Sequence, residues 1–414
     1  MREWARRLAR RAVRLTAEWH GGGPPAAGPI DVIDLFCGCG GLSAGFEIVG
    51  RLVPSYRLAG AVDVDPRATA TYAANLPLVP VLADLGTATA DRRSLAALAK
   101  ALRLRNGAPL VLVAGPPCQG FSAHRKKQGL VRDGRNGLIG SFARAAVFLK
   151  PDFVVLENVP ELLAKRHWTR FAELRDALEA AGYVVKAHIH NLAGFGVAQV
   201  RYRALVIAAR QSFAMPEPFL SIEDFRTVRD VIERLPPVSP GVPDQFDPMH
   251  CCTRHRPTTL RTIRRVPHDG GTRPRGVGPR CLDRVDGFRD VYGRLYWDRP
   301  ANTITAYARN PASGRYVHPE QDRGLTVREA ALLQGFPLNY SFSGPFDHRF
   351  VQIGNAVPPI FAAYLAAHVL GELFGGPLSD ALPSTASRGI EITAPTSNSF
   401  SSGIAGRKRR LALS

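Results

Sequence analysis

Long uninterrupted hydrophobic runs are missing from this chain of 414 residues. No window approaches the roughly 18 consecutive apolar residues of a membrane-spanning helix, so we expect no transmembrane segment. The N-terminus also lacks the apolar core of a secretory signal peptide. Its arginine-rich start superficially resembles an organellar presequence, an interpretation that stays open as a minor one.

Cysteine is scarce, with six residues in the whole chain. So few thiols form no disulfide framework for a protein of this size, which favours a reducing compartment. Cys251 and Cys252 lie close to His250 and His255 in the sequence. However, neither a C-x2-C pair nor an H-x3-5-H pair completes a tetrahedral site, so we expect no zinc or other metal.

Acidic residues are outnumbered: 35 Asp and Glu face 54 Lys and Arg, which gives a net charge of +19 and a pI of about 10.3. Residues 1–20 and 407–410 carry part of this charge, and the rest of the chain is basic as well. Binding to phosphates releases condensed counterions, so the charge favours a nucleic-acid partner. A compositional preference for arginine is the alternative explanation. The hydrophobic content of 45% allows a sizeable core and argues against global disorder.

The chain divides into segments of different composition. Residues 1–20 predict a basic helix with Trp4, Leu8, Leu15 and Trp19 on one stripe. Between 30 and about 210, β-branched runs alternate with helix-like stretches, as in a parallel α/β sheet. The following segment is rich in Pro, Arg and His, and helical patterns return at 327–334 and 359–374. We therefore expect a basic extension (1–29), an α/β domain (30–210) completed by 320–375, an irregular smaller domain (211–319) and a disordered tail (376–414).

Five buried-strand patterns end in polar or glycine-rich residues, at 32–36, 58–62, 79–82, 110–114 and 153–156. The carboxyl ends of parallel strands lie along one edge of the sheet, and ligands bind in the crevice there. The residues that follow these strands should therefore converge on one site although they are scattered along the sequence.

The loop after the first strand contains Gly38, Gly40 and Gly41, which allow a close approach of backbone to ligand at a helix start near Leu42. Ser43 occupies the last glycine position of G-x-G-x-x-G, which disfavours a nicotinamide enzyme. At the next two strand ends, Asp63 is placed like a ribose-hydroxyl acceptor and Asp84 like an acceptor for an adenine amine. Each aspartate has an alternative role as a helix N-cap.

Cys118 follows two prolines that stiffen the backbone after a buried strand. A basic stretch at 124–127 favours a lowered thiol pKa and a nucleophilic role, the alternative being a buried structural cysteine. Glu157 ends the neighbouring strand pattern. Together they suit addition to a pyrimidine: the thiolate attacks carbon 6, and the acid donates to ring nitrogen N3. Partial burial would raise the pKa of Glu157 so that it can donate, while a salt bridge or a cap is its alternative role.

The chain resembles the DNA cytosine-5 methyltransferase family of the bacterial restriction–modification type, over roughly 31–210 and 290–370. The resemblance is carried by these segments: DLFCGCGGLS (34–43), PPCQ (116–119), ENV (157–159), GVAQVRYR (196–203), YGRLYWDRPANTIT (292–305), LTVREA (325–330), LQGFP (333–337) and QIGNAVPP (352–359). It implies a doubly wound, mostly parallel α/β sheet of the S-adenosylmethionine-dependent methyltransferase fold with a smaller, irregular target-recognition domain.

The resemblance also implies roles for individual residues. Cys118 would be the nucleophile and Glu157 the partner of N3, while Arg203, with Arg201, would stabilise the target base and the active-site loop. Residues 133–136 match a mobile loop that closes over flipped DNA, and Ala198 departs from the proline usual in the family. Residues implied in the pocket for S-adenosylmethionine are Phe36, Gly38, Gly40, Asp63, Asp84, Pro117, Leu138, Asn355 and Ala356.

A cytosine inside a duplex is out of reach of Cys118, so it must be swung into the crevice while another lobe holds the DNA. Segment 211–319 suits that task. Its arginines are expected to contact phosphates or guanine, the alternative being solvated surface residues. Thr303 and Thr305 either touch the DNA backbone or serve as strand residues. The arginines are Arg254, Arg256, Arg261, Arg264, Arg265, Arg273, Arg275, Arg280, Arg284, Arg289 and Arg294.

The expected partners are double-stranded DNA and a cognate restriction endonuclease that acts on the same site without direct contact. We expect a monomer without membrane association, in the bacterial cytoplasm at the nucleoid. An RNA substrate is one alternative, disfavoured by the long basic segment 211–319. A DNA-binding regulator on a decayed methyltransferase scaffold is another, disfavoured by the retention of Cys118, Glu157 and Arg203. Water is the expected acceptor of the carbon 5 proton.

Overall fold

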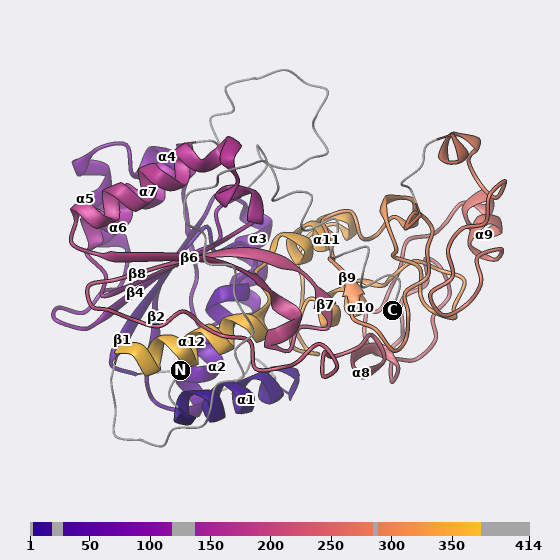
Figure 1. Cartoon of the computed structure of the whole chain (residues 1–414), viewed down its shortest axis with the longest axis horizontal. Helices are drawn as coiled ribbons and strands as arrows, with labels where there is room; N and C mark the ends of the chain where they lie inside the picture. Colours follow the sequence, from indigo (N-terminus) through magenta and orange to yellow (C-terminus); the bar gives the residue numbers. More distant parts are fainter. Residues whose placement is uncertain (1–2, 19–27, 118–136, 285–288, 374–414) are drawn as a thin grey trace.

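A twisted sheet of seven strands forms the centre of the larger lobe (Figure 1). The computed structural model describes residues 3–18, 28–117, 137–284 and 289–373. Within them the strand order is β3-β2-β1-β4-β5-β8-β6. The strands are β1 (Ile30–Leu35), β2 (Tyr56–Asp63), β3 (Val81–Leu82), β4 (Leu110–Ala114), β5 (Phe153–Asn158), β6 (Val184–Asn191) and β8 (Tyr202–Ala209).

Strands β1 to β5 pair in parallel, and β8 runs antiparallel between β5 and β6. The prediction of a mostly parallel α/β sheet is confirmed, as are all five predicted strand positions. The expectation that the third strand is buried is wrong, because β3 has only two residues at the sheet edge and Leu82 is 57% exposed. All five parallel strands end toward the same edge, so the residues predicted to act together lie there.

Helices cover both faces of this sheet, which confirms the doubly wound arrangement (Figure 1). On one face lie α4 (Leu85–Ala88), α5 (Arg92–Ala101), α6 (Leu138–Leu149) and α7 (Trp168–Ala180). On the other lie α2 (Gly41–Leu52), α12 (Pro359–Leu373) and, outside them, α1 (Glu3–Glu18). The remaining helices of this lobe are α3 (Pro66–Asn75), α10 (Val327–Leu333), α11 (Phe346–Asn355) and the short 3₁₀ turns η3 (Pro160–Leu163), η4 (Lys165–His167) and η5 (Leu192–Phe195).

The stretch Phe346–Leu373 is long and apolar enough to cross a membrane by composition, but 89% of its most apolar window is buried inside the protein. It contains α12, which packs against both α1 and α2. A buried core helix passes the same test as a membrane span, and burial of this extent fits a core helix.

The predicted N-terminal helix is present as α1, but its buried stripe differs from the predicted one. Ala5, Leu8, Ala9, Ala12 and Val13 face α12 and α2. Of the residues expected on the stripe, Leu8 is buried and Leu15 is half-buried, while Trp19 and the side chain of Trp4 lie outside the described residues. Small alanines let α1 approach α12 closely, and a pattern search that weights large side chains overlooks them.

The smaller lobe has little regular structure and is held by buried arginines. Its elements are α8 (Arg229–Ile232), α9 (Pro257–Ile263), η6 (Arg280–Asp283), η7 (Pro311–Ser313) and β9 (Ala301–Asn302), which pairs with β7 (Gln199–Val200). Arg294 is fully buried and donates to the carbonyls of Ile263, Val266, His318 and Gln321. The expectation that Arg294 reaches DNA is therefore wrong. Its guanidinium instead satisfies four backbone carbonyls that no helix or strand satisfies.

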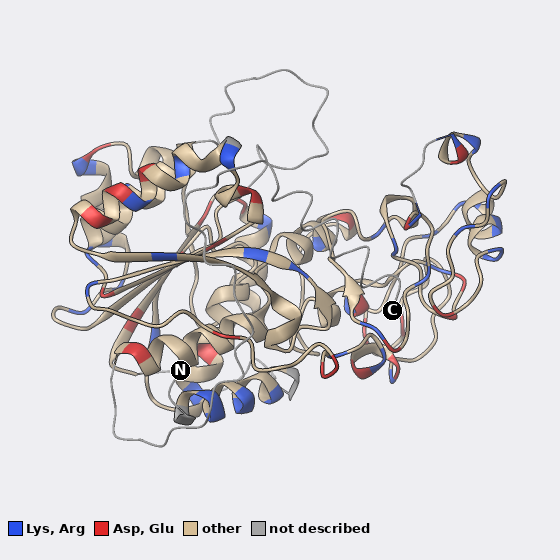
Figure 2. Ribbon diagram, viewed as in Figure 1, with Lys and Arg blue, Asp and Glu red and all other residues tan. Residues whose placement is uncertain are grey.

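Arg273 is likewise turned inward: it donates to the Val277 carbonyl and pairs with Asp283 at 2.9 Å. Nine predicted arginines remain exposed around α9 and the neighbouring loops (Figure 2). They are Arg254, Arg256, Arg261, Arg264, Arg265, Arg275, Arg280, Arg284 and Arg289. This lobe thus presents a basic surface.

Candidate active site

The loop after β1 adopts a left-handed conformation at three positions. Phe36, Gly38 and Gly40 have φ angles of 60°, 52° and 92°. A positive φ is unusual for an aromatic residue and marks local strain that the surrounding contacts must hold. The Gly38 N–H donates to Asp63 Oδ2 at 2.8 Å, and Asp63 Oδ1 accepts from Asp65 N–H at 2.9 Å. Burial raises the pKa of Asp63, although these backbone donors oppose the shift.

Among the described residues, a Cβ added to Gly38 would meet no atom within 4 Å, so they leave open space directly over this loop. Beyond Asp63, Val64 is 62% exposed, and Leu82 on the adjacent strand is also exposed. Asp84 is exposed and caps α4 through Oδ1, which accepts from Thr87 N–H at 2.9 Å. The N-cap role that the sequence left open for Asp84 is thus present, and its Oδ2 faces no hydrogen-bond donor in the described chain.

The C-terminal segment after α11 closes the other side of the loop. A Cβ on Gly41 would lie 2.1 Å from the Val357 carbonyl oxygen, and one on Gly115 would lie 3.3 Å from Val357 Cγ2. Asn355, the last residue of α11, is exposed, and Ala356 is half-buried. The structure therefore brings the loop of β1, the end of β4 and residues 355–357 together, as the predicted pocket requires.

Asp34 is an additional residue of this region to which the sequence assigned no role. It is almost fully buried in β1, and its Oδ2 accepts from the Ser43 hydroxyl at 2.7 Å and from Ser43 N–H at 3.2 Å. Burial raises its pKa to about 7, against the lowering effect of the Ser43 bonds. Tyr72 donates to the same hydroxyl. An acid inside a buried strand was the available signal, and its bonds to Ser43 tie β1 to the start of α2.

The carboxylate of Glu157 lies at the end of β5 with only 6% of the residue exposed. Arg203 on β8 places Nε 2.9 Å from Glu157 Oε1, and this oxygen has no well-aligned hydrogen bond within the described chain. Burial raises the pKa of Glu157, while Arg203 and then Arg201 oppose the rise. Glu157 is thus a buried carboxyl group beside the Arg203 cation, and the two act on its pKa in opposite directions.

The rigid lead-in to Cys118 is fastened to the strand that carries Glu157. Strands β4 and β5 pair with Ala114 opposite Leu156. Past their ends, the Asn158 side-chain amide donates to the Pro116 carbonyl at 3.3 Å. Pro117 is exposed and is the last residue described before the gap. Cys118 and loop 133–136 lie outside the described residues, and Leu138, beyond the gap, is half-buried at the start of α6.

Arg201 has a different environment from Arg203. It is 2% exposed, and its guanidinium donates to the carbonyls of Ile304, Gly354 and Ala356 at 3.1–3.2 Å. A cation at the C-terminus of α11 also interacts favourably with the helix dipole. Arg201 therefore links residues 354–356 at the end of α11 to Ile304, on the segment that leads into the smaller lobe.

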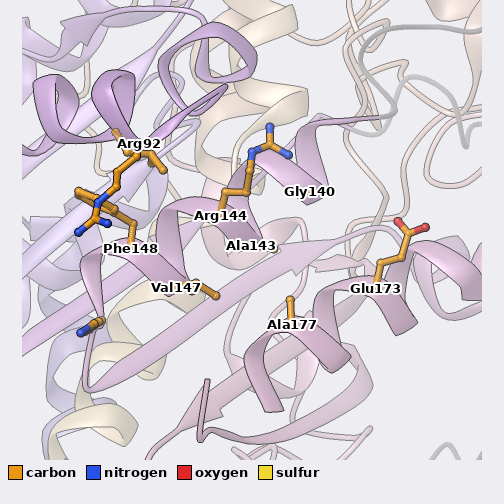
Figure 3. Close-up of a pocket in the computed structure, with 10 residues that line it drawn as sticks. Arg92, Gly140, Ala143, Arg144, Val147, Phe148, Glu173 and Ala177 are labelled. Atoms are coloured by element: carbon orange, nitrogen blue, oxygen red, sulfur yellow. The ribbon is translucent and has the colours of Figure 1, made fainter. Parts of the chain in front are cut away.

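A groove of about 670 Å³ lies between α5, α6 and α7, on the helical layer (Figure 3). It is lined by apolar residues such as Leu95 and Val147 and by Arg92 and Arg144. None of the predicted site residues lines it, because they follow the strand ends instead. Within the part of the chain that the structure describes, no cluster of His, Cys, Asp or Glu is arranged to hold a metal.

Comparison with known proteins agrees with this arrangement. The family profile described as C-5 cytosine-specific DNA methylase matches residues 30–370. The Type II methylase M.HgiDII of Herpetosiphon aurantiacus is 36% identical over 350 residues, covering 82% of this chain and 94% of that protein. The Type II methyltransferase M1.HphI of Haemophilus parahaemolyticus is 34% identical, covering 82% of this chain and 86% of that protein.

Solved structures share the fold at low sequence identity. A putative DNA modification methyltransferase encoded within a prophage of E. coli superposes with a TM-score of 0.62 at 23% identity, covering 83% of this chain and 99% of the other. Spodoptera frugiperda DNMT2 superposes with a TM-score of 0.53 at 15% identity, covering 82% and 98%. The α/β architecture with its smaller lobe is thus shared over nearly the whole length of those chains.

Proposed function

The chain belongs to the C-5 cytosine-specific DNA methylase family, and on that premise we propose how its own residues divide the work of methyl transfer. The protein is a DNA (cytosine-5-)-methyltransferase, so its reaction places a methyl group on carbon 5 of cytosine in DNA. The proposal concerns which side chains act and what each one does.

Cys118 is the nucleophile of the proposal. Its sulfur forms a bond to carbon 6 of the extruded cytosine, which makes carbon 5 nucleophilic. Glu157 donates a proton to ring nitrogen N3 and so neutralises the negative charge that the addition develops. Once carbon 5 carries the methyl group, loss of its proton to water, departure of the Cys118 sulfur as thiolate and return of the N3 proton to Glu157 restore the ring. The observation that carries this assignment is the Asn158–Pro116 hydrogen bond, which supports placing Cys118 beside Glu157.

Arg203 and Arg201 have separate tasks. Arg203 holds the Glu157 carboxyl in place and contributes positive charge next to the target base, as its 2.9 Å ion pair supports. Arg201 acts as a positioning residue, because its two terminal nitrogens donate to three backbone carbonyls. It fixes the wall of the donor pocket relative to the segment that leads into the smaller lobe.

The cofactor of the proposal is S-adenosylmethionine, which supplies an electrophilic methyl group when bound. The open space over Gly38 and the exposed apolar side chains of Val64 and Leu82 fit an adenosine group. Asp63 accepts from the ribose hydroxyls, and Asp84 accepts from the adenine amine through Oδ2. Phe36, Gly40, Pro117, Leu138, Asn355 and Ala356 line the rest of the pocket.

The substrate of the proposal is a specific sequence of duplex DNA, held on the exposed arginines of the smaller lobe. The two relatives named above are Type II methylases. We therefore infer that this enzyme acts in the bacterial cytoplasm, at the nucleoid, and protects host DNA from a cognate endonuclease. The endonuclease would recognise the same site without binding the methyltransferase, which works as a monomer.

The decisive experiment is bisulfite sequencing of DNA from a host that expresses the chain, next to a host that expresses Cys118→Ala. Protection of one cytosine within one recurring sequence, only in the first host, is the expected result. Unmodified DNA in both hosts, with folded protein present, would refute the proposed function.

A further inference from the structure

Tyr307 presents an aromatic ring to solvent on a rigid backbone. The residue is 67% exposed, and the described chain provides no hydrogen bond or ring contact for its side chain. Its backbone, by contrast, is fully engaged. The N–H donates to Thr305 Oγ1 at 3.3 Å, and the carbonyl accepts from Asn310 N–H at 2.9 Å and from Ser313 Oγ at 2.7 Å.

The loop that carries Tyr307 lies at the junction of the two lobes. On the side of the larger lobe, a Cβ on Gly354 would lie 2.2 Å from Ala306 N, and Arg309 pairs with Asp347 of α11 at 3.2 Å. On the side of the smaller lobe, the Thr253 hydroxyl donates to the Arg309 carbonyl at 3.1 Å. The ring therefore projects from a segment clamped between Gly354, one residue before Asn355, and the basic lobe.

The hydroxyls first expected to touch DNA in this segment are already engaged within the protein. Thr303 Oγ1 donates to the Val200 carbonyl at 2.8 Å, and Thr305 Oγ1 accepts from Tyr307 N–H and lies 3.2 Å from the Tyr316 hydroxyl. These bonds shape the loop. Tyr307 is a large side chain of the same loop, and its ring has no partner in the described chain.

A single exposed aromatic residue is common on protein surfaces and by itself needs no explanation. Two features set this residue apart. Its backbone is immobilised by three hydrogen bonds, so a contact made by the ring costs little backbone ordering. It also lies on a segment that contacts Gly354 of the larger lobe and Thr253 of the smaller lobe, so a duplex held on the basic lobe that delivers a base to the crevice of the sheet would pass this junction.

Removing a cytosine from the helix leaves a base step without its stacking partner, which is an energetic cost of the reaction. Side chains inserted at such steps replace the lost stacking, and aromatic rings do so without regard to sequence. We propose that Tyr307 packs its ring against the DNA step from which the target cytosine is withdrawn and so stabilises the extruded state. This inference rests on the proposed extrusion of cytosine for methyl transfer.

The test compares Tyr307→Ala and Tyr307→Phe in the full-length enzyme, with Phe246→Ala as the matched control. Phe246 is 86% exposed in the same lobe, so its removal changes a similar exposed surface. A duplex with 2-aminopurine at the target position reports extrusion by its fluorescence. Tyr307→Ala is expected to lower this signal and to reduce kcat/KM about tenfold or more, since one aromatic–base stack accounts for that much. Tyr307→Phe and Phe246→Ala are expected to stay within about twofold of the parent enzyme.

A duplex with an abasic target site separates extrusion from general DNA contact. The vacant step is present there without any base to withdraw, so the affinity deficit of Tyr307→Ala should persist on this duplex, and it should be absent on a duplex without the recognition sequence, from which no base is withdrawn. An unchanged 2-aminopurine signal in Tyr307→Ala overturns the inference, and so does a lower unfolding midpoint, because the ring would then support the fold. Failure of the proposed function has a different signature: the parent enzyme itself would not methylate DNA.

Discussion

Glu157 and Arg203 form a diagonal cross-strand pair at the carboxyl edge of the sheet. Glu157 stands opposite Leu205 in the β5–β8 ladder, and Arg203 is two residues away on the same face. Their side chains meet at 2.9 Å. A buried acid and its counter-ion are therefore positioned by strand register, without dependence on a loop, which makes the electrostatics of the site open to test.

The first prediction concerns pH. Glu157 must hold a proton to donate to N3, so activity is present below its pKa and is lost as pH rises through it. Arg203 lowers that pKa against the effect of burial. Arg203→Met removes this opposition, so the alkaline limb of the kcat profile should move to higher pH while kcat itself falls. A limb that stays in place, or moves to lower pH, would contradict the role of Glu157 as the acid. Glu157→Gln is the control, since it should lack this limb.

The second prediction concerns the nucleophile. Cys118→Ser should lower the rate of methyl transfer by a factor of about a thousand or more, while the affinities for DNA and cofactor stay unchanged. Incorporation of tritium from labelled S-adenosylmethionine measures the first quantity, and equilibrium binding measures the second. Cys281→Ser, at an exposed thiol of the smaller lobe, is the matched control. Full incorporation by Cys118→Ser would refute the assignment.

The third prediction separates the two arginines by stability. Arg201→Met deprives three carbonyls of a charged donor, so the free energy of unfolding should fall by about 3 kcal/mol. Arg203→Met removes the counter-ion of the buried Glu157, but that carboxyl can take up a proton and become neutral, so this variant should cost clearly less. Urea unfolding of both variants measures the difference. Equal losses would mean that Arg201 is no more of a brace than Arg203.

The fourth prediction concerns the cofactor. Asp63→Ala removes the acceptor of the Gly38 N–H and of the ribose hydroxyls, so affinity for S-adenosylhomocysteine should fall about tenfold or more. Asp84→Ser retains a good N-cap for α4 but is too short to reach a ligand. A severalfold loss of affinity in this variant, measured by calorimetry, would support contact with adenine. Unchanged affinity would leave Asp84 as a cap alone.

The fifth prediction concerns specificity. Replacing segment 211–319 with that of another such enzyme should change the DNA sequence that is methylated, provided that 297–305 are kept. Those residues contain β9, which pairs with β7, and the Ile304 carbonyl that Arg201 contacts. Bisulfite sequencing reads the outcome, and an active chimera with unchanged specificity would exclude this segment as the reader of sequence.

Much of the larger lobe was predictable because local patterns and global topology agree there. The apolar runs of β1, β2, β4 and β5 are buried strands, and candidate site residues lie at or just after the end of each run. The antiparallel β8 was not predicted, since burial on both faces gives parallel and antiparallel strands the same hydrophobic pattern.

The sequence did not show which arginines of the smaller lobe point into the protein and which point to solvent. Arg294 and Arg254 look alike in a basic segment, yet the first is buried among carbonyls and the second is exposed. Which of them turns inward depends on where the irregular backbone leaves acceptors unpaired. The two roles of Asp84 stayed open for a similar reason, because an N-cap and a ligand acceptor have the same local sequence.

The contact of Gly41 with the Val357 carbonyl has a consequence for synthesis. One wall of the proposed methyl-donor pocket leaves the ribosome early, and the opposite wall leaves it more than three hundred residues later. A nascent chain can thus complete its central strands and still lack a cofactor pocket. The protein can modify DNA only after its last core helices have emerged. Chains that end before Val357 should therefore be inactive, because they lack one wall of the pocket.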